Sequence, residues 1–197
     1  MERIVLITSF GPFSGHPVNA SSEVMKILQS ERPRGLLNED NIDLLFEFKE
    51  LPVAYAETKS FISEYWALHP PRLCVHIGVH SEDNIKIESQ CNNTKYIKED
   101  IMGLLPAEDK WPHDMSTLPL EKVAEIFNIE REEIEVVLSK DAGTYLCQYC
   151  LHNSLRCGNG RAAFIHVPPL SKRPAEITCR VVRRIILSIL ELTKCEN

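Results

Sequence analysis

Continuous apolar runs along the chain predict strands that are buried on both faces of a sheet. Five such runs occupy residues 3–10, 42–53, 72–79, 133–140 and 162–169. A sixth segment, residues 84–89, alternates polar and apolar positions, which is typical of a strand with one exposed face. Strands buried on both faces occur mainly in parallel sheets, so the pattern favours a mostly parallel, twisted sheet.

Apolar residues at helical spacing fill most of the intervals between these strands. They predict helices over residues 21–30, 55–69, 120–130, 144–155 and 175–193. Either Asn19 or Ser21 is placed to cap the first of them. Helices that alternate with buried strands indicate the α/β class. Residues 90–117 follow neither period, and we interpret them as a surface excursion of a kind that is often functional.

Length, composition and charge narrow the class of protein. A chain of 197 residues, 44% of them hydrophobic, predicts one domain over residues 1–197 with a sizeable core. The net charge is −6 and no stripe of Lys and Arg occurs, which argues against nucleic acid as a partner. No apolar run approaches the ~18 residues that a membrane span needs, so we expect no membrane partner.

The cysteines and the start of the chain bear on the compartment. Seven cysteines, an odd number, are poor material for a framework of disulfides. The first apolar run is too short for a secretory signal and fits a buried strand better. We therefore expect a cytoplasmic protein with reduced thiols.

The predicted sheet indicates where to look for chemistry. In a parallel sheet the carboxyl ends of the strands meet at one edge, and α/β proteins place their sites in the loops and helix starts that follow. The positions to inspect therefore come after Phe10, Val79, Lys140 and Ile165.

Cys147 and Cys150 stand three residues apart after the fourth of the buried runs. If a helix begins just before Cys147, its unpaired N–H groups favour a thiolate there, which is the form that acts as a nucleophile. A buried structural cysteine is the plain alternative. A redox pair would be expected after an early strand, and a zinc site would use Cys147, Cys150, His152 and Cys157, whose spacing is short for a structural site. These alternatives stay open at this point.

A thiolate nucleophile needs a base, which is normally a histidine. His166 is the strongest candidate because it ends a buried strand just before a Val-Pro-Pro turn. His80, which also follows a strand, is the main alternative. His76 lies inside a strand and fits a core histidine, and His152 shares the predicted helix of Cys147 without facing it.

Two aromatic residues, Phe10 and Phe13, flank a Gly-Pro turn after the first strand. The turn lacks the glycine spacing and the lysine of a phosphate loop. Two rings at the end of a strand are suited to hold a small flat ligand between them. The same pattern also fits two core phenylalanines at a turn.

Three separate segments resemble one known family. They are LITSFGPFSGHPVNAS (6–21), SKDAGTYLC (139–147) and AAFIHVPP (162–169). They are similar to the pyroglutamyl peptidase I family of cysteine peptidases, and more to its animal branch than to its bacterial one. The resemblance implies a three-layer α/β/α sandwich that hydrolyses the amide bond after an N-terminal pyroglutamyl residue, through a thioester acyl-enzyme. It implies no metal and no organic cofactor.

The resemblance also assigns roles to single residues. By motif, Cys147 is the nucleophile, His166 the acid and base, and Glu88 the third member of a catalytic triad. The residues that match those around the lactam ring of the substrate are Phe10, Phe13, Asn19 and Val79.

Four positions depart from the family pattern. Ser9 stands where a glycine is usual, and Ser89 follows the triad glutamate where a basic residue is common. Val79 replaces a glutamine and Gln148 an asparagine of the bacterial members. The expected partners are small peptides with an N-terminal pyroglutamate, and the expected state is a monomer or a weak homo-oligomer. The alternative function is a weak or inactive homologue that binds a cyclic, pyroglutamyl-like ligand without turnover.

Overall fold

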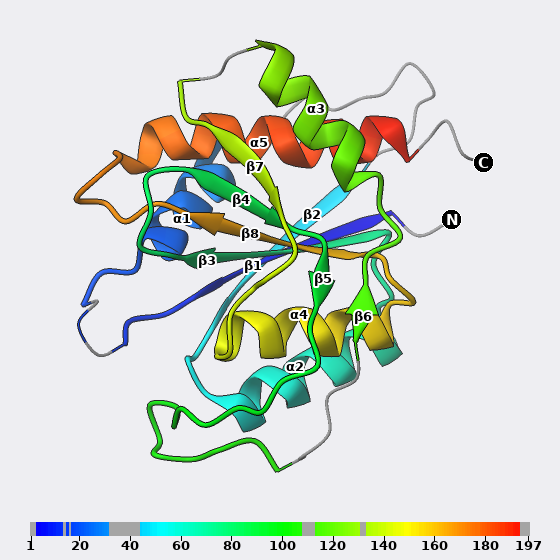
Figure 1. Ribbon diagram of the computed structural model, residues 1–197. Helices are drawn as coiled ribbons and strands as arrows, with labels where there is room; N and C mark the ends of the chain where they lie inside the picture. Colours follow the sequence, from blue (N-terminus) through cyan, green and yellow to red (C-terminus); the bar gives the residue numbers. More distant parts are fainter. Residues whose placement is uncertain are drawn as a thin grey trace.

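The computed structural model describes residues 3–13, 15, 17–31, 44–107, 113–130 and 133–193. Six strands of the described chain form one sheet (Figure 1). Their order across it is β2 (Leu45–Leu51), β1 (Ile4–Phe10), β3 (Leu73–Val79), β8 (Ala162–Val167), β4 (Ile85–Glu88) and β7 (Val136–Ser139). A separate two-stranded ladder joins β5 (Gln90–Cys91) to β6 (Asp114–Met115).

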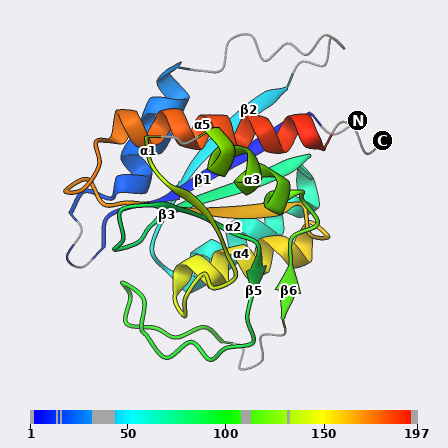
Figure 2. The ribbon, with the colours of Figure 1, turned by 45° about the horizontal axis from the view of Figure 1, so that its top comes forward.

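Helices cover both faces of the six-stranded sheet. On one face lie α1 (Ala20–Glu31), α3 (Leu120–Glu130) and α5 (Ala175–Leu192), and on the other lie α2 (Tyr55–Leu68) and α4 (Leu146–Cys157) (Figures 1 and 2). Each predicted helix is present within about two residues of its expected ends. The expected three-layer α/β/α sandwich with a mostly parallel sheet is therefore confirmed.

Strand direction changes part-way across the sheet. Strands β2, β1, β3 and β8 are parallel neighbours, whereas β4 pairs antiparallel with β8 and parallel with β7. The prediction that the chain leaves the sheet after Lys140 at the same edge as after Val79 is therefore wrong. The connection between β3 and β4 is shorter than the crossover that two parallel strands need, so β4 has to run back.

Two strands differ from prediction in their burial. The run 42–53 was expected to be covered on both faces, but β2 is an edge strand with several exposed positions, and residues 42 and 43 lie outside the described chain. The segment 84–89 was expected to be half exposed, but most of β4 is buried. The prediction failed at Glu88, because the alternation of polar and apolar residues treats every carboxylate as exposed. Glu88 lies in the interior, where it is paired.

Side chains alternate along β3 between two hydrophobic clusters. Val75 and Ile77 face the cluster under α1, α3 and α5, whereas Cys74 faces the cluster under α2 and α4. Cys147 packs against this second cluster, so the face of α2 and α4 carries the candidate nucleophile. Within the described residues, no helix combines the length and the apolar character that crossing a membrane would require.

Candidate active site

Cys147 is the second residue of α4, so it lies in the first turn of this helix, as predicted. The turn before the helix contains Gly143 at φ 85°, a backbone conformation that favours glycine, and its N–H donates to Oδ1 of Asp141 at 3.0 Å. No side chain caps the helix at Tyr145, and the first helical bond runs from Tyr149 N–H to that residue's carbonyl at 3.1 Å. The N–H groups of the first turn therefore point toward the site, where they favour negative charge.

A glycine in β3 makes room for the sulfur. A Cβ atom added at Gly78 would lie 3.2 Å from Sγ of Cys147 and 2.5 Å from Cζ of Phe164. Gly78 is also the register partner of His166 in the neighbouring strand β8. The sulfur of α4 thus lies directly over the sheet, at the level of the candidate base.

His166 lies between a carboxylate and the thiol. Its Nδ1 donates a hydrogen bond to Oε1 of Glu88 at 2.8 Å, and Glu88 is fully buried. Burial of the ring lowers the pKa of His166, but the charge and hydrogen bond of Cys147, followed by those of Glu88, outweigh it and raise this pKa to about 9. The imidazole therefore keeps its proton well above the ordinary histidine range, beside a sulfur that it can stabilise as a thiolate.

Cys147 and Cys150, the two cysteines near the start of α4, have different environments. Cys147 is partly exposed, whereas Cys150 is fully buried, and burial raises the pKa of Cys150 well above its ordinary value. In the described part of the chain, no group of three or more His, Cys, Asp or Glu side chains is arranged to hold a metal ion, so nothing supports the zinc alternative. Cys147 is therefore the accessible thiol of this pair, and Cys150 is its buried, unreactive neighbour.

The four predicted substrate-binding residues are placed differently. The ring of Phe10 is 6.3 Å from that of Phe164, and Phe13 packs partly buried against the same cluster as Cys147. Asn19 caps α1: its Oδ1 accepts from the N–H of Ser21 at 3.1 Å, and its Nδ2 donates to the carbonyl of Gly11 at 3.0 Å. Asn19 therefore fixes the turn that carries the two aromatic residues.

Val79 is the member of the set that points away. Its side chain packs against the cluster under α1, α3 and α5, on the face of the sheet opposite to Cys147. Only its backbone remains at the edge of the sheet near the site.

Sequence reasoning found no period in the excursion 90–117, but side chains fix its described part near Asp100 in place. Oδ2 of Asp100 accepts from the N–H of Tyr55 at the start of α2, at 2.9 Å, and its Oδ1 accepts from the N–H groups of Met102 and Leu104. Burial alone would raise the pKa of Asp100, but these backbone donors lower it below its ordinary value. Contacts of this kind follow no period, so the sequence pattern did not single out Asp100.

Comparison with known proteins decides the family. The sequence matches the pyroglutamyl peptidase family over residues 3–181. It is 34% identical to human pyroglutamyl-peptidase 1 over 198 residues, which cover 97% of this chain and 91% of that protein. It is also 37% identical to the human pyroglutamyl-peptidase 1-like protein over 168 residues, covering 80% of this chain and 82% of that protein. The chain belongs to the pyroglutamyl peptidase family.

A solved structure has the same fold. The pyrrolidone carboxyl peptidase from Thermococcus litoralis superimposes with a TM-score of 0.81 at 22% identity, over 99% of this chain and 96% of that one.

Three of the positions that depart from the family pattern have identifiable surroundings. Gln148 forms two hydrogen bonds with the backbone of Asn92, accepting at 3.2 Å and donating at 3.3 Å, so it joins α4 to the excursion. The hydroxyl of Ser89 donates to the carbonyl of Ser139 in β7 at 3.0 Å. Ser9 is fully buried, and its hydroxyl has no hydrogen-bond partner among the described residues.

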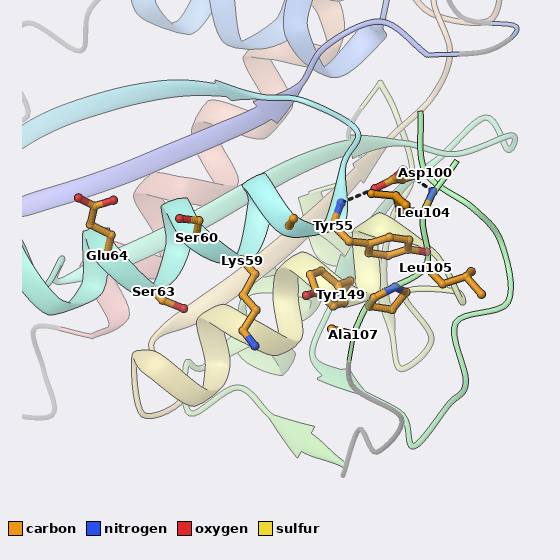
Figure 3. A pocket seen from close by; sticks show the side chains of 12 residues that line it. Tyr55, Lys59, Ser60, Ser63, Glu64, Asp100, Leu104, Leu105, Ala107 and Tyr149 are labelled. Atoms are coloured by element: carbon orange, nitrogen blue, oxygen red, sulfur yellow. Dashed lines mark hydrogen bonds between the residues drawn. The ribbon is translucent and has the colours of Figure 1, made fainter. Parts of the chain in front are cut away.

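The molecule also has a cavity away from these residues. It measures about 680 Å³ and lies between the N-terminal half of α2, the first turn of α4 and the loop after Asp100 (Figure 3). Tyr55 and Tyr149 form its inner wall, and Lys59 and Glu64 lie along α2. None of its twelve lining residues is a predicted site residue, although Tyr55 and Tyr149 belong to the hydrophobic cluster against which Cys147 packs.

Proposed function

We propose that the protein is a cysteine omega-peptidase that removes an N-terminal pyroglutamyl residue from small peptides. The observation that carries this proposal is the contact of His166 with Glu88 on one side and Cys147 on the other, in a member of the pyroglutamyl peptidase family. A carboxylate, an imidazole and a thiol in this order are the parts of a Cys–His peptidase.

In the acylation step, the thiolate of Cys147 attacks the carbonyl carbon of the pyroglutamyl residue. The oxyanion that forms accepts hydrogen bonds from the uncapped N–H groups at the start of α4. His166 donates its proton to the leaving nitrogen as the C–N bond breaks, which leaves a thioester and a free amine. A pKa of about 9 keeps that proton available at neutral pH.

In the deacylation step, water replaces the amine. His166, now neutral, takes a proton from the water as its oxygen attacks the thioester carbonyl. Collapse of the intermediate releases pyroglutamate and returns the thiolate–imidazolium pair. Glu88 holds Nδ1 through both steps and so keeps Nε2 directed at the reacting atoms.

Specificity for the pyroglutamyl group follows from its neutral ring. Phe10 and Phe13 flank the turn near Cys147; the partly buried Phe13 offers apolar surface to the flat lactam, and Phe10, only 3% exposed, lies beneath that surface. A peptide with an ordinary amino terminus would bring a charged ammonium to this surface, at a cost of several kcal/mol. We therefore assign lactam binding to these two residues and the shaping of their turn to Asn19.

The test is hydrolysis of a fluorogenic pyroglutamyl-coumarin amide. Cys147→Ala should lower kcat/KM at least about a thousandfold. The matched control is Cys157→Ala, an exposed cysteine at the far end of the same helix, which should leave it within about twofold. A prolyl-coumarin amide, whose ring nitrogen is charged, should react at least about a hundredfold more slowly than the pyroglutamyl substrate.

Two results would contradict the proposal. Wild-type protein that binds a pyroglutamyl peptide in calorimetry but hydrolyses no substrate would be a non-catalytic homologue. Cys147→Ala with wild-type activity would rule out the thiol mechanism.

A reducing compartment such as the cytoplasm suits this chemistry, because the partly exposed Cys147 has to stay a free thiol. Activity should therefore fall on mild oxidation and return with dithiothreitol. Activity that survives complete oxidation of Cys147 would contradict this placement.

A further inference from the structure

His80 lies on the catalytic face of the sheet, one step beyond the triad histidine. It is the first residue after β3, and its backbone N–H donates to the carbonyl of Val167 at 3.1 Å, which extends the pairing of β3 with β8. Because side chains alternate along a strand, His80 shares the face of Gly78, and Gly78 is the register partner of His166. The register of β3 and β8 therefore places the imidazoles of His80 and His166 next to each other.

The ring of His80 is fixed and uncharged. Its Nε2 lies 2.7 Å from the carbonyl oxygen of Asn84, which can only accept, so Nε2 carries the proton. Its Nδ1 is buried and has no hydrogen-bond partner among the described residues. Burial lowers the pKa of His80, and the charges of His166 and Lys86 lower it further, while the Asn84 bond and Glu82 oppose them. The ring is thus neutral around pH 7.

His166 is enclosed by two rings. The centroid of Phe164 lies 4.7 Å from that of His166, and the centroid of His80 lies 5.6 Å away at an interplanar angle of 40°. Phe164 is one step before His166 on the same face of β8, and His80 lies one step after it on β3. With Glu88 holding Nδ1, the imidazole is held on three sides and is only 7% exposed.

We propose that His80 is a positioning residue whose neutral ring closes the outer side of His166 and keeps its Nε2 directed at Cys147. The inference rests on the proposed function, because the direction of Nε2 matters only if His166 transfers protons to and from groups at Cys147. A neutral ring fills the space without repelling the imidazolium, and the Asn84 carbonyl keeps that ring from rotating.

The experiment compares His80→Ala, which removes the ring, with His80→Phe, which keeps a ring without nitrogens. Ser81→Ala, an exposed neighbour, is the matched control. His80→Ala should lower kcat about tenfold and leave KM within about twofold, because a displaced acid/base group affects the transition state more than ground-state binding. His80→Phe should restore kcat to within about threefold of wild type. Its plot of kcat against pH should keep the acid and the alkaline limb of the wild-type plot.

Alkylation of Cys147 by iodoacetamide gives a readout that needs no peptidase activity. The rate at pH 7, divided by the rate at the alkaline plateau, reports the thiolate fraction. This ratio should fall in His80→Ala and recover in His80→Phe. If wild-type protein hydrolyses no pyroglutamyl substrate, the proposed function fails, and the alkylation ratio still tests the position of His166.

Three results would overturn the role of His80. A His80→Ala variant that keeps wild-type kcat and alkylation ratio would show that the ring positions nothing. A folded His80→Phe as impaired as His80→Ala would show that the nitrogens matter instead of the ring. A His80→Phe profile that lacks one limb of the wild-type pH profile would make His80 a proton-transfer group in its own right.

Discussion

At the scale of single residues, burial separates the candidate glutamates. Glu82 and Glu88 lie in the same short stretch, and the sequence offers little to choose between them. Glu82 is exposed and pairs with Lys86, whereas Glu88 is fully buried against His166. A buried carboxylate is retained only with a partner, so the pairing explains why a polar residue occupies the interior of β4.

Ser9 is a residue whose hydroxyl costs stability. It is buried without a hydrogen-bond partner among the described residues, so Ser9→Ala should raise the free energy of unfolding by about 1 kcal/mol. Ser21→Ala is the matched control, since the hydroxyl of Ser21 donates to Asn19 at 2.9 Å and accepts from the N–H of Phe10 at 3.2 Å. That variant should lose about 1–2 kcal/mol. Urea unfolding of both variants measures the difference, and losses of equal size would contradict the assignment.

At the scale of elements, α4 and β3 together set the height of the sulfur above the sheet. His76 of β3 is fully buried, and its two ring nitrogens contact the hydroxyls of Thr8 in β1, at 2.7 Å, and Ser154 in α4, at 2.6 Å. This chain of hydrogen bonds fixes the helix that carries Cys147 against two strands. Toward the catalytic edge, the absence of a side chain at Gly78 lets the first turn of α4 come close.

Gly78→Ala should therefore impair catalysis more than stability. The added methyl group would lie 2.5 Å from the ring of Phe164, which has to move, and would press on Sγ of Cys147. Overpacking of this kind costs about 1–3 kcal/mol, whereas a misplaced nucleophile costs about a hundredfold in kcat. Thermal unfolding and steady-state rates measure the two effects. A stable variant that retains kcat within twofold would show that the close approach of α4 is not needed.

At the scale of the whole molecule, the sequence predicts the layers better than the site. Apolar periodicity predicts the five helices of the described residues and the six strands of their main sheet, because each element buries one face or two against its neighbours. The end of β8 places His166 at the edge of the sheet, but Cys147 follows β7, whose direction the pattern does not predict, and reaches the same edge through the turn before α4. The contact of Glu88 with His166 depends on β4 running antiparallel to β8, and strand direction has no periodic signal. The short connection after Val79 was the available clue.

Irregular segments are the part of the molecule that pattern predicts least. Gln148 and Asp100 attach the excursion to α4 and α2 through hydrogen bonds to single backbone groups. Each contact of this kind depends on one polar residue at one position, so it leaves no repeating pattern in the sequence. One domain over residues 1–197 and a monomeric or weakly associated state stay predictions.

Two histidines with opposite shifts predict a pH window for the whole molecule. Burial lowers the pKa of His76 to about 3 from its ordinary value of 6.5, so the folded protein binds fewer protons there than the unfolded chain. The contribution of His76 to the free energy of unfolding should be fully present above about pH 6.5 and should be lost as the pH drops toward 3. The pKa of His166 is raised to about 9, so its stabilising contribution is present below 6.5 and is lost as the pH rises through 9. Activity should decline over the same alkaline range, because the imidazolium that protonates the leaving amine is lost.

The acid side of this window is tested by urea unfolding at pH 7 and pH 4.5. Because His76 stays neutral in the folded protein, it accounts for about 2.5 kcal/mol of the decrease in the free energy of unfolding from pH 7 to pH 4.5. Each pKa unit corresponds to about 1.4 kcal/mol. His76→Gln cannot gain a proton, so its free energy of unfolding should start lower at pH 7, where it lacks the ring, but fall less steeply. Carboxylates titrate in both proteins and cancel in the comparison. Parallel losses in the two proteins would mean that acid acts elsewhere, and that the hydrogen bonds to Thr8 and Ser154 tolerate a charged ring.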